Sequence, residues 1–194
     1  MSERGGPAPK IIVFVLITLF AATNLHAGNV KYKRTVETYT VPGVTLVNQD
    51  GKRVDFRSLL LESEKPVLLD FIYATCTTIC PILSVGFSNL QKRLGQDSGS
   101  VQLVSISIDP DNDTPEIMKD YLRRYRAKPG WDFLTGNRTD IIAVMRAFDA
   151  YVANKMNHYP LTILHAQGDD KWVRIYGLLG TADLMEEYKK LSSK

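Results

Sequence analysis

The chain has 194 residues and a formal net charge of +3 at pH 7. Hydrophobic residues make up 44% of it and charged residues 23%, which is the balance of an ordinary globular protein able to bury a core. No basic block is present that would bind a phosphate backbone, so nucleic acid is excluded as a partner.

The first 27 residues are typical of an export signal. Arg4 and Lys10 precede an apolar run over residues 11–22, which is shorter than the roughly 20 residues that cross a bilayer. With small Ala27 as a cleavage point, the pattern predicts a signal peptide over residues 1–27, or alternatively an uncleaved inner-membrane anchor. The protein is then exported and periplasmic, or anchored to the inner membrane and facing the periplasm.

The remaining chain divides into an irregular lead-in over residues 28–42 and one domain over residues 43–194. Hydrophobic periodicity and turn residues predict its elements in chain order. They are a hairpin at 43–56 around Asp50-Gly51, a helical turn at 57–61, a buried strand at 66–73, a helix from 79 to a stop at Gly95, a buried strand at 101–108, a helix opened by Thr114-Pro115-Glu116, a strand at 131–134, a helix at 140–148, a hairpin at 161–164 and 171–176, and a helix at 181–191.

This order of elements predicts the fold class. Strands alternate with helices in the middle of the domain, and hairpins lie at its start and near its end. The expected fold is an α/β sandwich with a mixed central sheet, flanking helices and an extra N-terminal hairpin. In the helix opened by Thr114, we expect Ile117, Tyr121 and Tyr125 to line one face.

Both cysteines lie where the first buried strand gives way to a helix, in Phe71-Ile-Tyr-Ala-Thr-Cys76-Thr-Thr-Ile-Cys80-Pro81. A helix N-terminus favours anions, so we expect both thiols to ionise more readily than a free cysteine. Two thiolates so close could form a redox-active disulfide or bind one soft ion such as Cu(I) or Zn²⁺. A purely structural disulfide is the third reading, although such a small loop gains little stability from a cross-link.

Three stretches together resemble one known family. They are the cysteine stretch, Ser107-Ile-Asp109-Pro110 with Asp113-Thr114-Pro115, and a lone histidine before the last hairpin. In this order over residues 40–191 they resemble the SCO/SenC family of copper-binding proteins. The resemblance implies a thioredoxin-like fold and a role in assembling the binuclear copper centre of cytochrome c oxidase.

The resemblance also implies a ligand set. Cys76 and Cys80 match the family's two thiolate ligands, and His158 matches the third, with Asn157 standing where the family usually has Asp. His158 precedes a strand among polar residues, whereas His165 falls within the strand, where we expect a packed or hydrogen-bonded role. Met156 is another soft donor, to which we assign a surface or packing role.

Acidic residues raise two further questions. Asp70 interrupts a buried strand, where it either bonds to backbone at a strand edge or acts as a proton relay for the thiols. Asp109, Asp111 and Asp113 alternate like the start of a calcium loop. The glycine of such a loop is missing, because Thr114 occupies its place, so we expect a tight turn whose exposed acids could touch a partner.

Three functions follow as hypotheses. The first is a copper chaperone that holds Cu(I) or Cu(II) and passes it to the copper-receiving oxidase subunit. It is not an enzyme, and another copper chaperone or a thiol reductant is a further possible partner. The second is a thiol-disulfide oxidoreductase that keeps the oxidase cysteines reduced, with Cys76 attacking and Cys80 resolving. The third is a redox or copper sensor with a structural disulfide.

Overall fold

The structure is a computed structural model that describes residue 1 and residues 32–192. The predicted leader therefore lies, apart from Met1, outside the described residues. Among the described helices, none is both long and apolar enough to span a membrane. The elements are β1 Lys33–Glu37, β2 Thr45–Asn48, β3 Arg53–Asp55, α1 Phe56–Leu61, β4 Val67–Ile72, α2 Cys80–Leu94, η1 Gly95–Ser100, β5 Gln102–Ser107, α3 Pro115–Arg124, β6 Trp131–Thr135, α4 Arg138–Ala147, η2 Lys155–Asn157, β7 Leu161–His165, β8 Trp172–Tyr176 and α5 Thr181–Ser192.

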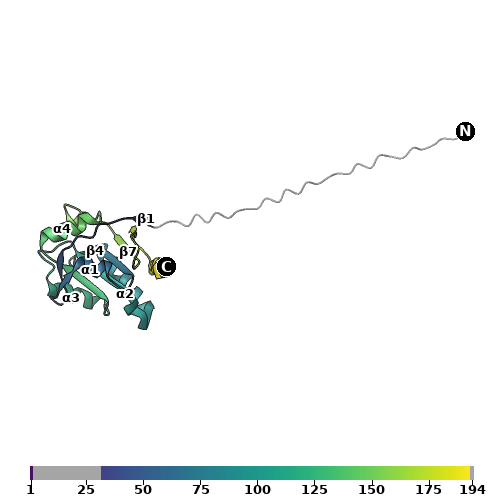
Figure 1. The fold of residues 1–194 in the computed structure, drawn as a ribbon. Coiled ribbons are helices and arrows are strands. Elements are labelled where there is room, and N and C mark those ends of the chain that lie inside the picture. The colour runs from purple at the N-terminus through teal and green to yellow at the C-terminus, as the bar shows by residue number, and fades with distance from the viewer. Residues whose placement is uncertain (2–31, 193–194) are drawn as a thin grey trace.

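The eight strands form one sheet in the order β1-β8-β7-β4-β5-β6-β2-β3. Figure 1 labels three of them, β1, β4 and β7. β4, β5 and β6 are parallel, because α2 and α3 carry the chain back between them. All other neighbours pair antiparallel, and the β2–β3 hairpin forms one edge. The predicted α/β sandwich with a mixed sheet and an N-terminal hairpin is confirmed.

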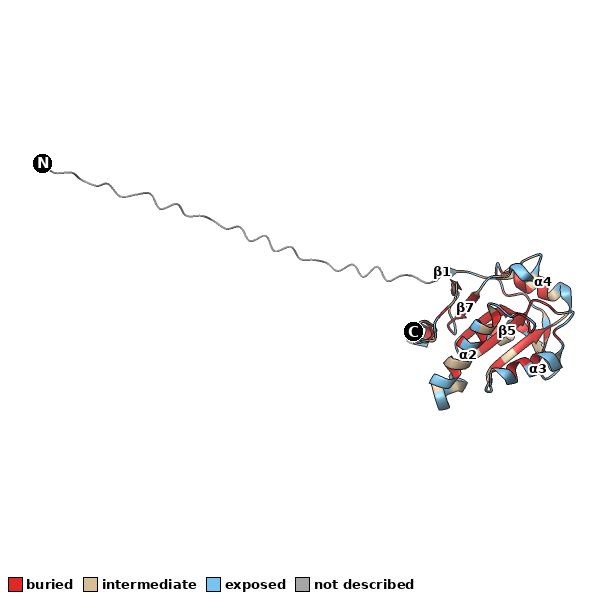
Figure 2. Ribbon diagram, turned by 180° about the vertical axis from the view of Figure 1, so that it is seen from behind, coloured by how far each residue is buried: buried red, intermediate tan, exposed pale blue. Residues whose placement is uncertain are grey.

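Helices pack on both faces of the sheet. On one face, Phe87 of α2 lies edge-on to Trp131 of β6, with ring centroids 5.6 Å apart. On the other, Phe148 at the end of α4 packs against Phe71 of β4 and Phe56 of α1. Figure 2 shows buried residues concentrated in the strands and on the inner sides of the helices. Every residue of β4 is buried, as its continuous apolar run predicted.

Side-chain caps fix where α3 and α4 begin. Thr114 caps α3 by accepting a hydrogen bond from the Ile117 N–H, and Asn137 caps α4 in the same way. Ile117, Tyr121 and Tyr125 follow one another at a spacing of four, but Ile117 is exposed, and the buried positions of α3 are Met118, Tyr121 and Leu122. The inward stripe therefore starts one residue later than the spacing suggested.

The lead-in over residues 28–42 was predicted to be irregular, and this is wrong for β1. Residues 33–37 pair antiparallel with β8 and form the far edge of the sheet. The strand is polar and largely exposed, so it carries no hydrophobic signal, and its backbone partner lies about 140 residues later in the chain. Arg34 also donates to the buried Glu187 of α5 at 2.9 Å, which anchors this edge.

Candidate metal centre

The candidate site forms where three segments meet at the carboxyl ends of β4 and β5. One is the turn between β4 and α2 that carries Cys76, and another is the loop from Asp109 to Asp113. The third is η2, with His158 directly after it and before β7. In open α/β sheets this edge, beyond the carboxyl ends of the parallel strands, is the usual place for a ligand.

The structure brings Cys76, Cys80 and His158 together. Their ligand atoms all lie within 4.8 Å of one another. His158 Nε2 is 3.1 Å from Cys80 Sγ and 4.0 Å from Cys76 Sγ. Both cysteines are free thiols and buried, and His158 is half-buried. Two sulfurs and one ring nitrogen therefore converge on a single point.

Hydrogen bonding orients His158 as a ligand. Its Nδ1 lies 2.7 Å from the carbonyl oxygen of Lys155, and a carbonyl can only accept, so Nδ1 carries the proton. Nε2 then presents its lone pair toward the two sulfurs. Burial lowers the pKa of His158, which favours the neutral ring that binds metals.

The two thiols differ, contrary to the expectation that both ionise readily. Burial would raise the pKa of Cys76, but hydrogen bonds from Cys80 and from the backbone of Thr78 outweigh it and lower the pKa to about 7. At Cys80, burial together with its role as donor to Cys76 raises the pKa above the usual value. The expectation was right for Cys76 and wrong for Cys80, because desolvation at a fully buried sulfur exceeds the helix-terminus effect.

A buried carboxylate holds the strand end that precedes Cys76. Asp113 accepts from the backbone N–H of Ala74, at 3.2 and 3.3 Å, and from the Ser107 hydroxyl at 2.6 Å. Burial raises the pKa of Asp113, and these hydrogen bonds oppose the rise. The acidic loop after β5 therefore ties β5 to the cysteine turn.

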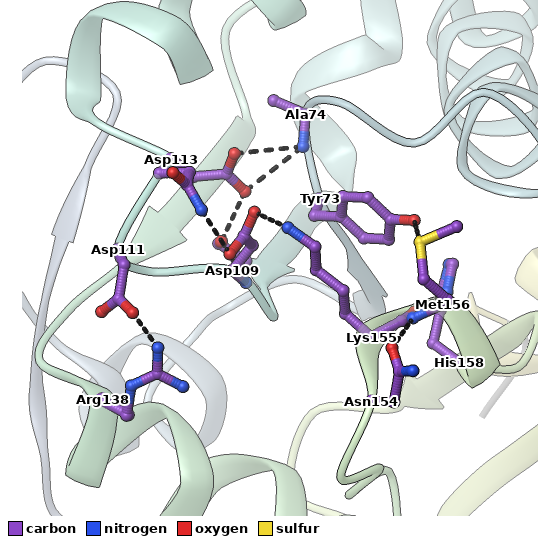
Figure 3. Close-up of polar contacts among 12 residues, drawn as sticks. Tyr73, Ala74, Asp109, Asp111, Asp113, Arg138, Asn154, Lys155, Met156 and His158 are labelled. Atoms are coloured by element: carbon purple, nitrogen blue, oxygen red, sulfur yellow. Dashed lines mark hydrogen bonds and ion pairs between the residues drawn. The ribbon is translucent and has the colours of Figure 1, made fainter.

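Lys155 links η2, which directly precedes His158, to the carboxyl ends of β4 and β5. Its ammonium group pairs with Asp109 and lies 5.1 Å from the centroid of the Tyr73 ring. Tyr73 in turn contacts the His158 ring, with centroids 5.1 Å apart. Figure 3 shows Lys155 reaching from η2 to Asp109, with Tyr73 and Met156 beside it. The loop that carries His158 is thus fixed to both parallel strands.

The acidic side chains after β5 form hydrogen bonds and ion pairs with other residues of the same chain. Asp109 is buried and also accepts from Asn112 at 2.9 Å, while Asp111 pairs with Arg138 (Figure 3). The expectation that these acids are exposed to a partner is therefore wrong for Asp109 and Asp113. Their carboxylates stabilise the turn, which agrees with the expected tight turn in place of a calcium loop.

Asp70 does not bond to backbone as one sequence interpretation held. It is completely buried, and neither carboxylate oxygen has a hydrogen-bond partner among the described residues. Burial raises its pKa to about 7, which the neighbouring Ser105 hydroxyl opposes only in part. That hydroxyl accepts from Trp131 Nε1 at 3.1 Å. Asp70 is thus a protonatable group buried in the core of the sheet.

His165 has the packed role expected of it. Its ring stacks on Trp172 with centroids 3.9 Å apart, and its Nε2 donates to the carbonyl of Asp169 at 2.7 Å. One ring face and one nitrogen are thereby engaged in the β7–β8 hairpin, and His165 is absent from the cluster of donors.

The supporting residues were missed from the sequence. Tyr73, Asp109, Asp113 and Lys155 position the three donors, yet none was assigned a role at the site. A signal was available for the first three, because Tyr73 follows directly on β4 and both aspartates lie in the loop after the carboxyl end of β5. Lys155 carried no such signal, since its partner Asp109 is 46 residues away.

The donor set selects the kind of metal. Thiolate sulfur and imidazole nitrogen suit Cu(I), Cu(II) and Zn²⁺, whereas Ca²⁺ and Mg²⁺ require oxygen. Three protein donors are one fewer than a closed tetrahedral site has, so an ion held here could take one further ligand.

Comparison with known proteins identifies the family to which the chain belongs. A model of the SCO1/SenC family matches residues 34–171. The chain belongs to the SCO1/SenC family. The "SCO1 protein homolog" of Bacillus subtilis is 41% identical over 99 residues, which cover 50% of each chain. The chain spans about half the length of that relative.

Two solved structures of the SCO1/SenC family share the fold. One is BsSco, described as a member of the Sco family of cytochrome c oxidase assembly proteins with a disulfide switch. It is 30% identical with a TM-score of 0.66, covering 82% of this chain and 96% of that chain. The other is Bradyrhizobium japonicum ScoI with copper bound, at 28% identity and a TM-score of 0.63, covering 78% and 99%. These likenesses confirm the expected thioredoxin-like fold.

Proposed function

We propose that the protein is a copper chaperone in which Cys76, Cys80 and His158 hold copper. The observation that carries this proposal is the convergence of the three donor atoms within 4.8 Å, with His158 Nε2 free to bind. The donor set suits copper, and the related ScoI is known with copper bound. Copper is here the cargo of the protein.

We infer that the copper goes to a copper-binding subunit of cytochrome c oxidase. Membership of the SCO1/SenC family supports this, as does the description of BsSco as one of the cytochrome c oxidase assembly proteins. The basic and apolar pattern of residues 1–27 supports export, with the domain facing the periplasm from a cleaved or anchored form.

The thiol geometry favours a second function, thiol-disulfide exchange. An attacking thiol works best with a pKa near the ambient pH, and the pKa of Cys76 is about 7. Cys80 is buried with a raised pKa, which suits a resolving thiol. In this reaction Cys76 attacks a substrate disulfide, Cys80 then displaces the reduced substrate, and the protein ends as the Cys76–Cys80 disulfide.

One experiment separates the two functions. The protein is mixed with the copper-site domain of an oxidase subunit, first copper-loaded with the target reduced, then copper-free with the target oxidised. A chaperone produces the binuclear copper spectrum, and this is lost in Cys76→Ser and weakened in His158→Ala. A reductase reduces the target disulfide without copper, and His158→Ala retains that rate. Failure to transfer copper would contradict the first proposal.

A further inference from the structure

Met156 is an exposed sulfur donor at the edge of the metal centre. It lies in η2, two residues before His158, and its side chain is 69% exposed. An apolar side chain with a packing role would be buried, as Met118 and Met145 are. A packing role is therefore wrong for Met156, whereas the surface role that the sequence also allowed agrees with its exposure.

The thioether is held in place beside the three donors. The Tyr73 hydroxyl donates to Met156 Sδ at 3.4 Å, and the Tyr73 ring packs edge-on against the ring of His158 (Figure 3). Tyr73 also lies close to Cys76, whose backbone N–H donates to the Tyr73 carbonyl at 3.1 Å. The Tyr73 side chain thus contacts both the Met156 thioether and the His158 imidazole.

Exposure distinguishes the sulfurs from one another. Cys80 is 0% exposed and Cys76 5% exposed, so solvent barely reaches either thiol. Met156 is open to solvent on the same turn that carries His158. Within residues 32–192 the other methionines are buried or, like Met185 of α5, packed against the core. Met156 is therefore more open to solvent than any of the three donors Cys76, Cys80 and His158.

We propose that Met156 is an accessory ligand through which Cu(I) enters and leaves the Cys76–Cys80–His158 centre. The inference rests on the proposed copper-binding function and adds a fourth donor to it. A thioether is soft and neutral, so it binds Cu(I) with little desolvation cost and releases it readily. As the Cu–Sδ bond forms, a bond to the delivering ligand breaks. Cys76 then displaces the thioether, its thiol proton passes to solvent, and copper remains Cu(I) throughout.

A kinetic experiment tests the transit role. Reduced protein is loaded with Cu(I), and uptake and release to bathocuproine disulfonate are followed by stopped flow for wild type, Met156→Leu and Tyr73→Phe. Leu preserves the volume of Met without its sulfur, and Phe keeps the ring against His158 without the hydroxyl. We expect uptake and release both to slow by about tenfold in Met156→Leu, with Kd nearly unchanged. Tyr73→Phe should slow both rates in the same direction, and Met185→Leu should match wild type.

A spectroscopic readout makes the outcome specific. In protein labelled with ¹³C at the methionine methyl groups, the Met156 resonance should shift or broaden at substoichiometric Cu(I), while the ion exchanges through Sδ, and the Met185 resonance should not. Stoichiometric binding with a Met156 signal unperturbed at substoichiometric Cu(I) and unchanged rates in Met156→Leu would overturn this inference and leave the proposed function standing. Faster release with a weaker Kd would also overturn it, because Met156 would then be a permanent ligand. Absence of stoichiometric binding by wild type would instead contradict the proposed function.

Discussion

The carboxylate of Asp113 accepts two contacts from the backbone N–H of Ala74, at 3.2 and 3.3 Å, two residues before Cys76. A leucine at position 113 would leave this buried N–H and the Ser107 hydroxyl unpaired, at about 1–3 kcal/mol for each donor. We expect Asp113→Leu to lower the free energy of unfolding and to weaken copper binding by about tenfold or more.

Asparagine at the same position is the control for Asp113. Asp113→Asn keeps one acceptor oxygen for the Ala74 N–H, so we expect it to recover most of the copper affinity. Denaturant unfolding and competition with a Cu(I) chelator measure the two effects separately. Equal copper affinity in Asp113→Leu and wild type would show that this contact does not position the cysteine turn.

Lys155 provides a test of the histidine loop. Lys155→Met leaves the buried Asp109 without its cation and removes the cation above the Tyr73 ring. Losing an exposed ion pair costs about 0–1 kcal/mol, and breaking a buried one costs about 3–5 kcal/mol. We expect the free energy of unfolding to fall by an amount between these two ranges. Copper affinity should fall by about tenfold because His158 is no longer held in place.

The matched control removes an ion pair that lies outside the candidate site. Lys119 donates to Asp50 at 2.9 Å, and both side chains are exposed. Lys119→Met should change neither copper affinity nor thermal stability measurably. If Lys155→Met behaves like this control, the Lys155–Asp109 pair has no positioning role.

Asp70 predicts a pH dependence of stability. Its pKa is about 7 in the folded protein against 3.8 as the ordinary value, so between these pH values the folded state holds a proton that the unfolded state has lost. Stability therefore falls as pH rises from about 4 to about 7, by up to about 4 kcal/mol from this group. Asp70→Asn cannot ionise and should lack this part of the slope.

Denaturant unfolding at several pH values measures this difference. Other acids titrate in both proteins, so the comparison uses wild type minus Asp70→Asn. We expect the stability advantage of the variant to grow steadily from pH 4 to pH 7. Parallel curves would mean that Asp70 does not hold its proton in the folded state.

The two thiols should react with alkylating agents at different rates. Cys76 has a pKa of about 7, whereas Cys80 is fully buried with a raised pKa. Iodoacetamide at pH 7 should therefore modify Cys76 well before Cys80, because the thiolate is the reactive form. Peptide mass spectrometry of the reduced protein gives the order, and Cys80 reacting first would contradict the assigned roles.

The sequence predicted the parts of the structure that local patterns encode. The buried β4, the proline-started α3 and the paired cysteines all carry short-range signals, such as a continuous apolar run or Thr114 before Pro115. The resemblance to a family supplied His158, which lies 82 residues from Cys76. These elements and the three donors could thus be named before the structure.

Contacts between residues far apart in the chain could not be predicted from the sequence. β1 is polar, and its strand conformation depends on pairing with β8. Lys155 pairs with Asp109 because the tertiary fold brings η2 next to the end of β5. The raised pKa of Cys80 likewise depends on burial that the helix start alone does not reveal. Each miss arises where tertiary packing overrides a local preference.

The most direct test of the account is copper titration of the reduced protein with visible spectroscopy. We predict one copper per chain and a sulfur-to-Cu(II) charge-transfer band. The band should be altered in His158→Ala and lost in Cys76→Ser, and it should be unchanged in Asn157→Ala, which replaces the exposed neighbour of His158. Wild type that binds no stoichiometric copper, or binding that is unchanged in Cys76→Ser, would contradict the assignment of the centre.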